Sequence, residues 1–285
     1  MKVCLDAKDL IGILQVGQHC TANQFAQYLT RHGCQLAVSS YTIMEISAPL
    51  LYPSSKTNVM KLLNDLAGLP IAYVHADIRG LELREALDAF SSGREYQHIL
   101  PFVKRFEEAL DLSAKPGTYQ FINYSLSGIV WDLYAQGGLQ GMDHYAKSMK
   151  EYVAADRGMK LPPSLKSHFA KVVERNLRDD GLLCQRFQLR IFQIGSMYDS
   201  PDRCPSIRLS YEVWHQIVKN KADRLKDSDM EDYQPLICLP YVDFITLDRR
   251  MHRYVSQAAK RIGMHCSTRM FMSAAEVLKQ IAPGN

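Results

Sequence analysis

The sequence lacks the features that mark membrane and disulfide-rich proteins. No apolar run approaches the roughly 18 residues that a membrane-spanning helix needs. The N-terminal stretch meets a charge at Asp6, too early for a signal peptide, and resembles a first strand instead. The seven cysteines are an odd number and include no C-x-x-C pair, which argues against a disulfide framework and a structural zinc site. We therefore expect a cytoplasmic protein with reduced cysteines.

Several common uses of an α/β sheet are excluded as well. The sequence has no G-x-x-x-x-G-K-[ST] motif, which excludes a P-loop nucleotide hydrolase, and no G-x-S-x-G nucleophile elbow. Its glycine cluster at 137–141 falls in a region with helical periodicity rather than after a strand. A dinucleotide-binding fingerprint would have to follow a strand, so that function is excluded too.

Charge is unevenly distributed along the chain. The formal net charge of +4 does not by itself indicate nucleic-acid binding. Residues 157–190, however, hold eight basic against three acidic residues, with Lys171 and Arg175 among the basic ones. A solvated helix face and a phosphate-binding face explain this segment equally well.

The two ends of the chain share one pattern. Residues 1–90 predict strands at 2–5, 36–38 and 71–74 that alternate with helices, and the C-terminal part predicts strands at 243–246 and near 265–267 with helices at 250–262 and 273–281. Residues 91–202 show helical periodicity and no convincing strand. We therefore expect an α/β fold, a three-layer α/β/α arrangement with a central parallel sheet, built from residues 1–90 and 210–285 and split by a mostly α-helical insertion at 91–209.

Acidic residues occur where such a sheet binds ligands. Asp6 ends the first predicted strand and Asp248 ends a late one, and ligands bind in the crevice outside the carboxyl ends of strands, at the topological switch point. Glu45 and Asp229 are expected in the first turns of helices that begin on the same side. Asp232 lies about one helical turn beyond Asp229 and is a further candidate. The sequence predicts that these acids converge.

Converging carboxylates predict a metal ion. Clustered carboxylates repel one another and raise one another's pKa unless a cation compensates. Carboxylate oxygens without histidine or thiolate select hard ions, so Mg²⁺ or Mn²⁺ is expected. Such an ion activates water and neutralises the charge that develops on a phosphodiester. Phosphodiester hydrolysis is the reaction that fits these residues best.

The order of these motifs resembles the PIN-domain nucleases. The similar stretches are "VCLDAKDL", "SSYTIMEIS", "DSDMEDYQPLICLPYVDFITLD" and "MSAAEVLKQI", which lie within residues 1–90 and 210–285. The resemblance implies a Mg²⁺- or Mn²⁺-dependent hydrolase, a nuclease or endoribonuclease such as a toxin, a defence enzyme or a processing enzyme, with RNA favoured over DNA. It also implies a set of site residues. The implied metal ligands are Asp6, Glu45, Asp229 and Asp248, with Thr246 as a hydroxyl helper.

Two departures from the family pattern affect these expectations. Pro235 falls where the family continues a helix, so that helix must kink or restart. This leaves Asp229, preferred for its spacing to Asp248, and Asp232 as alternatives for the third ligand. The insertion at 91–209 is far longer than the connection in a minimal PIN domain. It is expected to form a clamp over the crevice, or to bind a partner protein or a second copy of the chain.

Arginines follow the last acid. Arg249, Arg250 and Arg253 begin a predicted helix, where the macrodipole favours acids, so local helix stability does not explain them. Contact with phosphates is a hypothesis that does. With Lys171 and Arg175, they are the predicted nucleic-acid-binding residues.

Other interpretations of the same residues remain open. Asp6 alone is typical of a turn or cap residue, and Glu45 could complete a capping box with Thr42. The chain could also be a PIN-like scaffold that binds nucleic acid or a protein without cutting, if the insertion occludes the site. A phosphoacceptor domain shares the acidic pocket, but the lysine it needs after a late strand is not evident.

Overall fold

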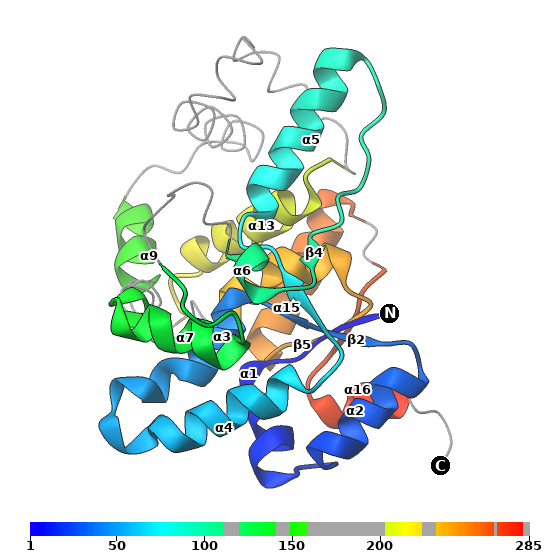
Figure 1. Ribbon diagram of the computed structural model, residues 1–285. Helices are drawn as coiled ribbons and strands as arrows, with labels where there is room; N and C mark the ends of the chain where they lie inside the picture. Colours follow the sequence, from blue (N-terminus) through cyan, green and yellow to red (C-terminus); the bar gives the residue numbers. More distant parts are fainter. Residues whose placement is uncertain (111–119, 141–148, 159–202, 224–231, 265–266, 282–285) are drawn as a thin grey trace.

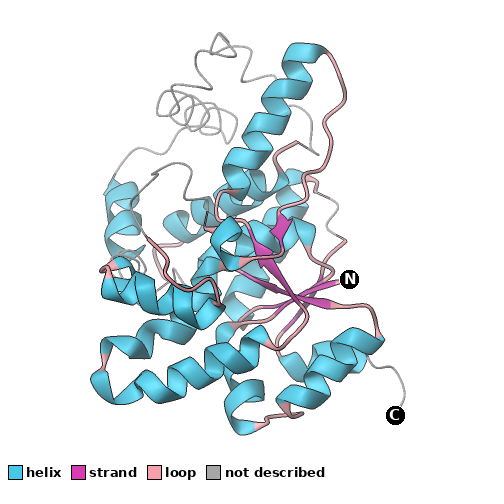
Figure 2. Cartoon of the chain, viewed as in Figure 1, coloured by secondary structure: helices cyan, strands magenta, loops and turns pink. Residues whose placement is uncertain are grey.

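The computed structural model describes residues 1–110, 120–140, 149–158, 203–223, 232–264 and 267–281, and Figure 1 labels its elements. In this part of the chain six strands form one sheet: β1 (Lys2–Cys4), β2 (Gln35–Val38), β3 (Ile71–Val74), β4 (Phe102–Val103), β5 (Phe244–Thr246) and β6 (Arg269–Phe271). Their order across the sheet is β4-β3-β2-β1-β5-β6. Helices surround these strands (Figure 2).

The strand order brings the two ends of the chain together. β1 pairs in parallel with β2 on one side and with β5 on the other. β6 then pairs in parallel with β5. The prediction that both ends of the chain build one sheet is therefore confirmed.

The sheet is mixed, which corrects the expected all-parallel sheet. β4 pairs antiparallel with β3 and comes from the segment 91–209, where no strand was expected. The chain leaves β3 through α5 (Ile78–Ser92) and returns at the carboxyl end of β3, where the His75 N–H donates to the Pro101 carbonyl (2.9 Å). Because the chain returns from that end without crossing the sheet, β4 runs in the opposite direction.

Alternate strand residues enter two hydrophobic clusters, one on each face of the sheet. Val3 and Phe244 belong to the first cluster, whereas Cys4 and Ile245 belong to the second. This alternation is expected of strands that are buried on both faces. The arrangement is an α/β fold compatible with the expected three layers.

Each cluster has its own covering of helices. The first packs against α1 (Ala7–Ile11), η1 (Gly12–Val16), α2 (Ala22–Arg31), α3 (Ser40–Ser47), η2 (Ala48–Leu51), α4 (Lys56–Ala67), α6 (Phe106–Ala109), α7 (Leu126–Ala135) and α16 (Ala274–Ile281). The second packs against α5, α9 (Met149–Gly158), α13 (Pro205–Lys219), η5 (Gln234–Tyr241) and α15 (Arg249–Ile262). The short η3 (Pro53–Ser55) precedes α4.

The described parts of the expected insertion pack on the α/β core. α7 contributes to the first cluster and α9 to the second. The boundary expected between residues 209 and 210 falls inside α13, so one continuous helix spans it. The division into core and insertion stays a prediction.

Two expectations about cysteines and membranes can be compared with the structure. Five cysteines lie in the described residues, and all five are buried and free: Cys4, Cys20, Cys34, Cys204 and Cys238. No helix within the described ranges combines the length and apolar character needed to cross a bilayer. A cytoplasmic location stays a prediction.

Candidate active site at the ends of β1 and β5

Two aspartates follow the two central strands at their carboxyl ends. Asp6 lies two residues after β1 and Asp248 two residues after β5, and these strands pair in parallel. β2 lies beyond β1 on one side, and β6 beyond β5 on the other. The chain therefore turns in opposite directions from β1 and β5, which makes this edge the topological switch point of the sheet.

Both aspartates also cap a helix. The Asp6 carboxylate accepts a hydrogen bond from the Lys8 N–H (2.8 Å), and Asp248 accepts one from the Met251 N–H (2.6 Å). The interpretation of Asp6 as a cap is confirmed. Each cap uses one carboxylate oxygen, and within the described residues the second oxygen of each aspartate accepts no hydrogen bond. Each aspartate can therefore cap its helix with one oxygen and bind a metal ion with the other.

Thr246 connects the two strand ends. Its side chain is buried, and its Oγ1 accepts a hydrogen bond from the Asp6 N–H (2.6 Å). Its hydroxyl also lowers the pKa of the nearby Asp9 carboxyl. Thr246 thus fixes the main chain that carries Asp6, a positioning role consistent with the predicted hydroxyl helper.

Asp9 is an acid near Asp6 that sequence reasoning missed. Burial and the charge of Asp6 raise the pKa of the Asp9 carboxyl, against hydrogen bonds from Thr246 and from the Ala274 N–H (3.1 Å). The available signal was its spacing, since Asp9 lies three residues after Asp6 at the start of a helix, on the same side.

Glu45 comes from the second turn of α3, not from the first turn as expected. Ser39 caps this helix, because its Oγ accepts a hydrogen bond from the Thr42 N–H (3.1 Å). Glu45 is therefore the sixth residue of α3. The capping box of Thr42 with Glu45 is wrong, because Thr42 itself holds the third helical position, where the box needs its acid.

Asp232 precedes a break in the helix. Pro235 lies in the first turn of η5, a 3-10 helix, so the chain restarts there as its proline predicts. Asp232 is half-buried. Asp229 lies outside the described residues, so the choice between the two stays a prediction.

A small pocket collects these side chains. It takes Asp6, Glu45, Asp232 and Asp248 from four separate stretches of chain, together with Thr246. Its volume of about 20 Å³ exceeds the roughly 10–15 Å³ that one water molecule requires. The pocket admits a water or a single ion, and a larger substrate would have to lie over its opening. We call it the acid pocket.

The carboxylate oxygens of the acid pocket are the type of ligand that a hard cation prefers, but they are not arranged closely around one point. Cys4 also lines the pocket, but its hydrogen bond with Cys238 and its burial raise the pKa of its thiol, which disfavours a thiolate ligand. Within the described ranges, no group of three or more His, Cys, Asp or Glu residues is arranged to hold a metal ion. Mg²⁺ often binds through one or two protein carboxylates and keeps several waters, so widely spaced acids still fit it.

The predicted basic residues divide into three groups. Arg249 and Arg253 are exposed at the start of α15, beside the acid pocket. The Arg250 Nη1 lies 3.9 Å from Oδ1 of Asp223, which gives Arg250 a structural partner. Lys171 and Arg175 lie outside the described residues. The first turn of α15 contains no acid, so the macrodipole still does not explain its arginines.

A second carboxyl site lies away from the acid pocket. Glu82 on α5 is fully buried, and its carboxylate accepts hydrogen bonds from the Ser206 N–H (2.8 Å), the Ile207 N–H (3.1 Å) and the Tyr241 hydroxyl (2.6 Å). The two amides belong to the first turn of α13, so Glu82 caps that helix from outside. Burial raises the pKa of Glu82 to about 7, although these hydrogen bonds lower it.

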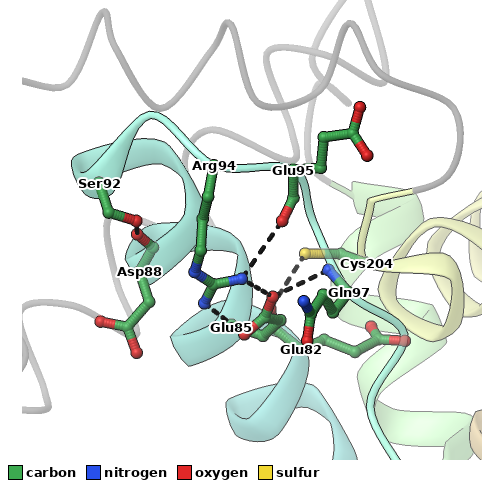
Figure 3. Close-up of polar contacts among 8 residues, drawn as sticks. All are labelled: Glu82, Glu85, Asp88, Ser92, Arg94, Glu95, Gln97 and Cys204. Carbon is green, nitrogen blue, oxygen red and sulfur yellow. Dashed lines mark hydrogen bonds and ion pairs between the residues drawn. The ribbon is translucent and has the colours of Figure 1, made fainter.

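Figure 3 shows the polar contacts around Glu82 and those of its neighbour Glu85 on the same helix. The Cys204 thiol lies against the Glu82 carbonyl (3.6 Å), in the buried part. One turn along α5, Glu85 pairs with Arg94 through two contacts of 2.5 and 2.7 Å. The hydrogen bonds from Arg94 lower the pKa of the Glu85 carboxyl. Glu82 is therefore a buried structural acid, and Glu85 is its half-buried neighbour.

The chain was compared with protein-family models, with curated proteins and with solved structures, and none of the three comparisons found a match. The PIN-domain resemblance therefore rests on the sequence motifs alone.

Proposed function

We propose that this protein is a divalent-metal-dependent nuclease that hydrolyses phosphodiester bonds of nucleic acid, RNA in preference to DNA, as its PIN-like motifs suggest. One observation carries the proposal. Four acids from separate stretches of chain line one small pocket at the switch point of the sheet. Carboxylates gathered in this way repel one another unless a cation offsets their charge.

The residues of the pocket have distinct parts in the proposed reaction. Asp6 and Asp248 are held by their caps, so each presents its second oxygen from a fixed main chain. Thr246 fixes the Asp6 main chain from the neighbouring strand. The chemistry that a bound Mg²⁺ or Mn²⁺ supplies is activation of a water and neutralisation of charge on the phosphodiester. Arg249 and Arg253 hold the phosphates of the substrate beside the pocket.

Asp6→Asn and Asp248→Asn test the proposal. Asparagine caps a helix as well as aspartate does, so these variants lose the charge and keep the helix start. With Mn²⁺ and end-labelled single-stranded RNA or DNA, we expect each variant to cut about 100-fold more slowly or worse, since even outer partners of a metal ligand contribute about 10- to 100-fold.

The matched control is Glu95→Gln. Glu95 is exposed after α5, and Figure 3 shows its side chain directed away from the polar groups around it. This variant should cut like the parent. If the two Asn variants also cut like the parent, the acid pocket is not the active site.

A scaffold that binds nucleic acid or a protein without cutting it is the second candidate. It is favoured by the finding that, within the described residues, no three His, Cys, Asp or Glu side chains are arranged to hold a metal ion. Electron paramagnetic resonance of Mn²⁺ titrated into the protein separates the two candidates. Mn²⁺ that binds in an Asp6-dependent way, without any cleavage, would favour the scaffold.

A further inference from the structure

A groove much larger than the acid pocket lies between α13 and α15. Its volume is about 700 Å³, within the range of about 300–1,000 Å³ that ligand sites occupy. α13 and its cap contribute Gln216, Lys219 and Asn220, and α15 contributes Gln257, Lys260 and Arg261. With Tyr254 of α15, the lining thus combines three cations, three side-chain amides and one tyrosine.

The groove carries a surplus of positive charge. Lys219 and Lys260 are exposed, and within the described residues neither forms an ion pair. Arg261 pairs with the buried Glu212 (2.8 Å), which offsets one of the three charges. The groove is therefore complementary to an anion with more than one charge.

The C-terminal carbonyls of α13 already have a cationic partner other than Lys219. Cations near a helix C-terminus are favoured by the macrodipole. Arg157 already fills that role, because its guanidinium donates to the carbonyls of Ile217, Val218 and Asn220 at 2.9–3.2 Å. Lys219 is thus an additional charge directed to the groove.

One buried glutamine of the groove lining lacks a hydrogen-bond partner. The Gln216 side chain is 9% exposed and donates through Nε2 to Glu212 (3.2 Å). Its Oε1 is buried and has no hydrogen-bond partner in the described part of the chain. Buried acceptors are nearly always partnered, so this oxygen requires a donor. The lining of the groove therefore includes a side chain whose hydrogen bonding is incomplete within the described residues.

One helix connects the groove to the acid pocket. α15 begins directly after Asp248 and contains no acidic residue. Arg250, Gln257 and Arg261 recur on one face at helical spacing, over about 16 Å at a rise of about 1.5 Å per residue. A strand whose phosphate lies at the acid pocket can therefore continue along α15 into the groove.

We propose that the groove between α13 and α15 binds the phosphate backbone of a nucleic-acid strand next to the bond to be cut, with Lys219 and Lys260 as phosphate contacts. This inference rests on the proposed nuclease function and adds the path of the substrate. It predicts that residues outside the acid pocket contribute to the affinity for nucleic acid.

The test is the double variant Lys219→Gln/Lys260→Gln, measured by fluorescence anisotropy with labelled single-stranded RNA and DNA. EDTA is present, so that cleavage cannot affect the measurement. Two lost phosphate contacts should weaken binding by on the order of tenfold at moderate salt and reduce the slope of log K against log [KCl] by about 1.4.

The matched control is Lys61→Gln/Lys279→Gln, which removes two exposed lysines from α4 and α16, on the other face of the sheet. This control should bind like the parent. Thermal melts check that both double variants are folded. Equal affinity of the groove variant and the parent would overturn the proposal, as would a parent that binds neither nucleic acid.

Competition separates nucleic acid from an acidic protein. Polyglutamate should displace the labelled strand much less effectively than unlabelled RNA at the same total charge. Equal displacement would assign the groove to an acidic polypeptide and overturn the proposal. Since binding in EDTA does not depend on cleavage, a groove that binds RNA in a protein that never cuts would overturn the nuclease function. It would leave the groove as a nucleic-acid-binding site without a bond to be cut beside it.

Discussion

Glu82 and the acid pocket place carboxylates in different surroundings, because Glu82 is fully buried whereas Asp6 is half-buried and Asp248 is exposed. Around Glu82, the chain supplies two amides and a tyrosine hydroxyl to one carboxylate. In the acid pocket, Asp6 and Asp248 each accept one amide and stand among further acids. The first arrangement is complete within the chain. We infer that a cation completes the acid pocket. Substitutions of its aspartates should therefore affect activity more than stability.

The largest expected change in stability comes from Glu82→Ala. At pH 6 it leaves two buried amides and the Tyr241 hydroxyl without their acceptor, at about 1–3 kcal/mol for each unsatisfied group. We expect the free energy of unfolding to fall by about 3–5 kcal/mol in denaturant titrations. The control is Glu85→Ala, one turn along the same helix in a pair with the exposed Arg94, which should lose much less. Equal losses would mean that Glu82 is not a structural acid.

The next effect is a dependence of stability on pH. The pKa of Glu82 is raised from its ordinary 4.5 to about 7, so between these values the folded chain binds a proton more tightly than the unfolded chain does. The resulting stabilisation is full below about pH 4.5 and is lost as the pH rises through about 7. The shift corresponds to roughly 3 kcal/mol at about 1.4 kcal/mol per pH unit.

Glu82→Gln should flatten this dependence, although its overall stability will also be lower. Unfolding free energies at pH 5, 6, 7 and 8 measure the slope in both proteins. A small slope of the same sign should remain in the variant, because the pKa of Asp9 is also raised. An unchanged slope would assign the pH dependence to other groups.

The sequence predicted elements with strong local signals and missed those that depend on tertiary contacts. The central strands alternate between two buried faces, so their apolar runs were plain. β4 has two residues and exists because the chain returns beside β3. No local pattern encodes such a pairing.

The same distinction applies to the acids. Asp6 and Asp248 were predictable because each follows a strand directly, whereas Glu82 resembled a surface residue of a helix. The overlooked signal was its spacing, since Ile78, Glu82 and Ala86 recur at four-residue intervals and all are fully buried. An acid on the apolar face of a helix indicates a buried carboxyl that needs donors from elsewhere in the fold.

A smaller loss is expected for Thr246→Val. The valine leaves the Asp6 N–H without its acceptor, which should lower the free energy of unfolding by about 1–2 kcal/mol. It also removes a hydrogen bond that lowers the pKa of Asp9. Thr246→Ser keeps the hydroxyl and should restore the cleavage that valine reduces. A serine variant as inactive as the valine variant would show that the methyl group matters, not the hydrogen bond.

The smallest change in stability is expected where the largest change in activity is proposed. Without divalent metal, Asp6→Asn and Asp248→Asn keep their caps and remove one of several neighbouring negative charges, so unfolding free energies should stay within about 0.5 kcal/mol of the parent or rise. With Mn²⁺ at 100 times its dissociation constant, the parent should gain about 2.7 kcal/mol, and the variants less. A large loss in the metal-free variants would mean that these aspartates hold the fold through contacts that asparagine cannot replace.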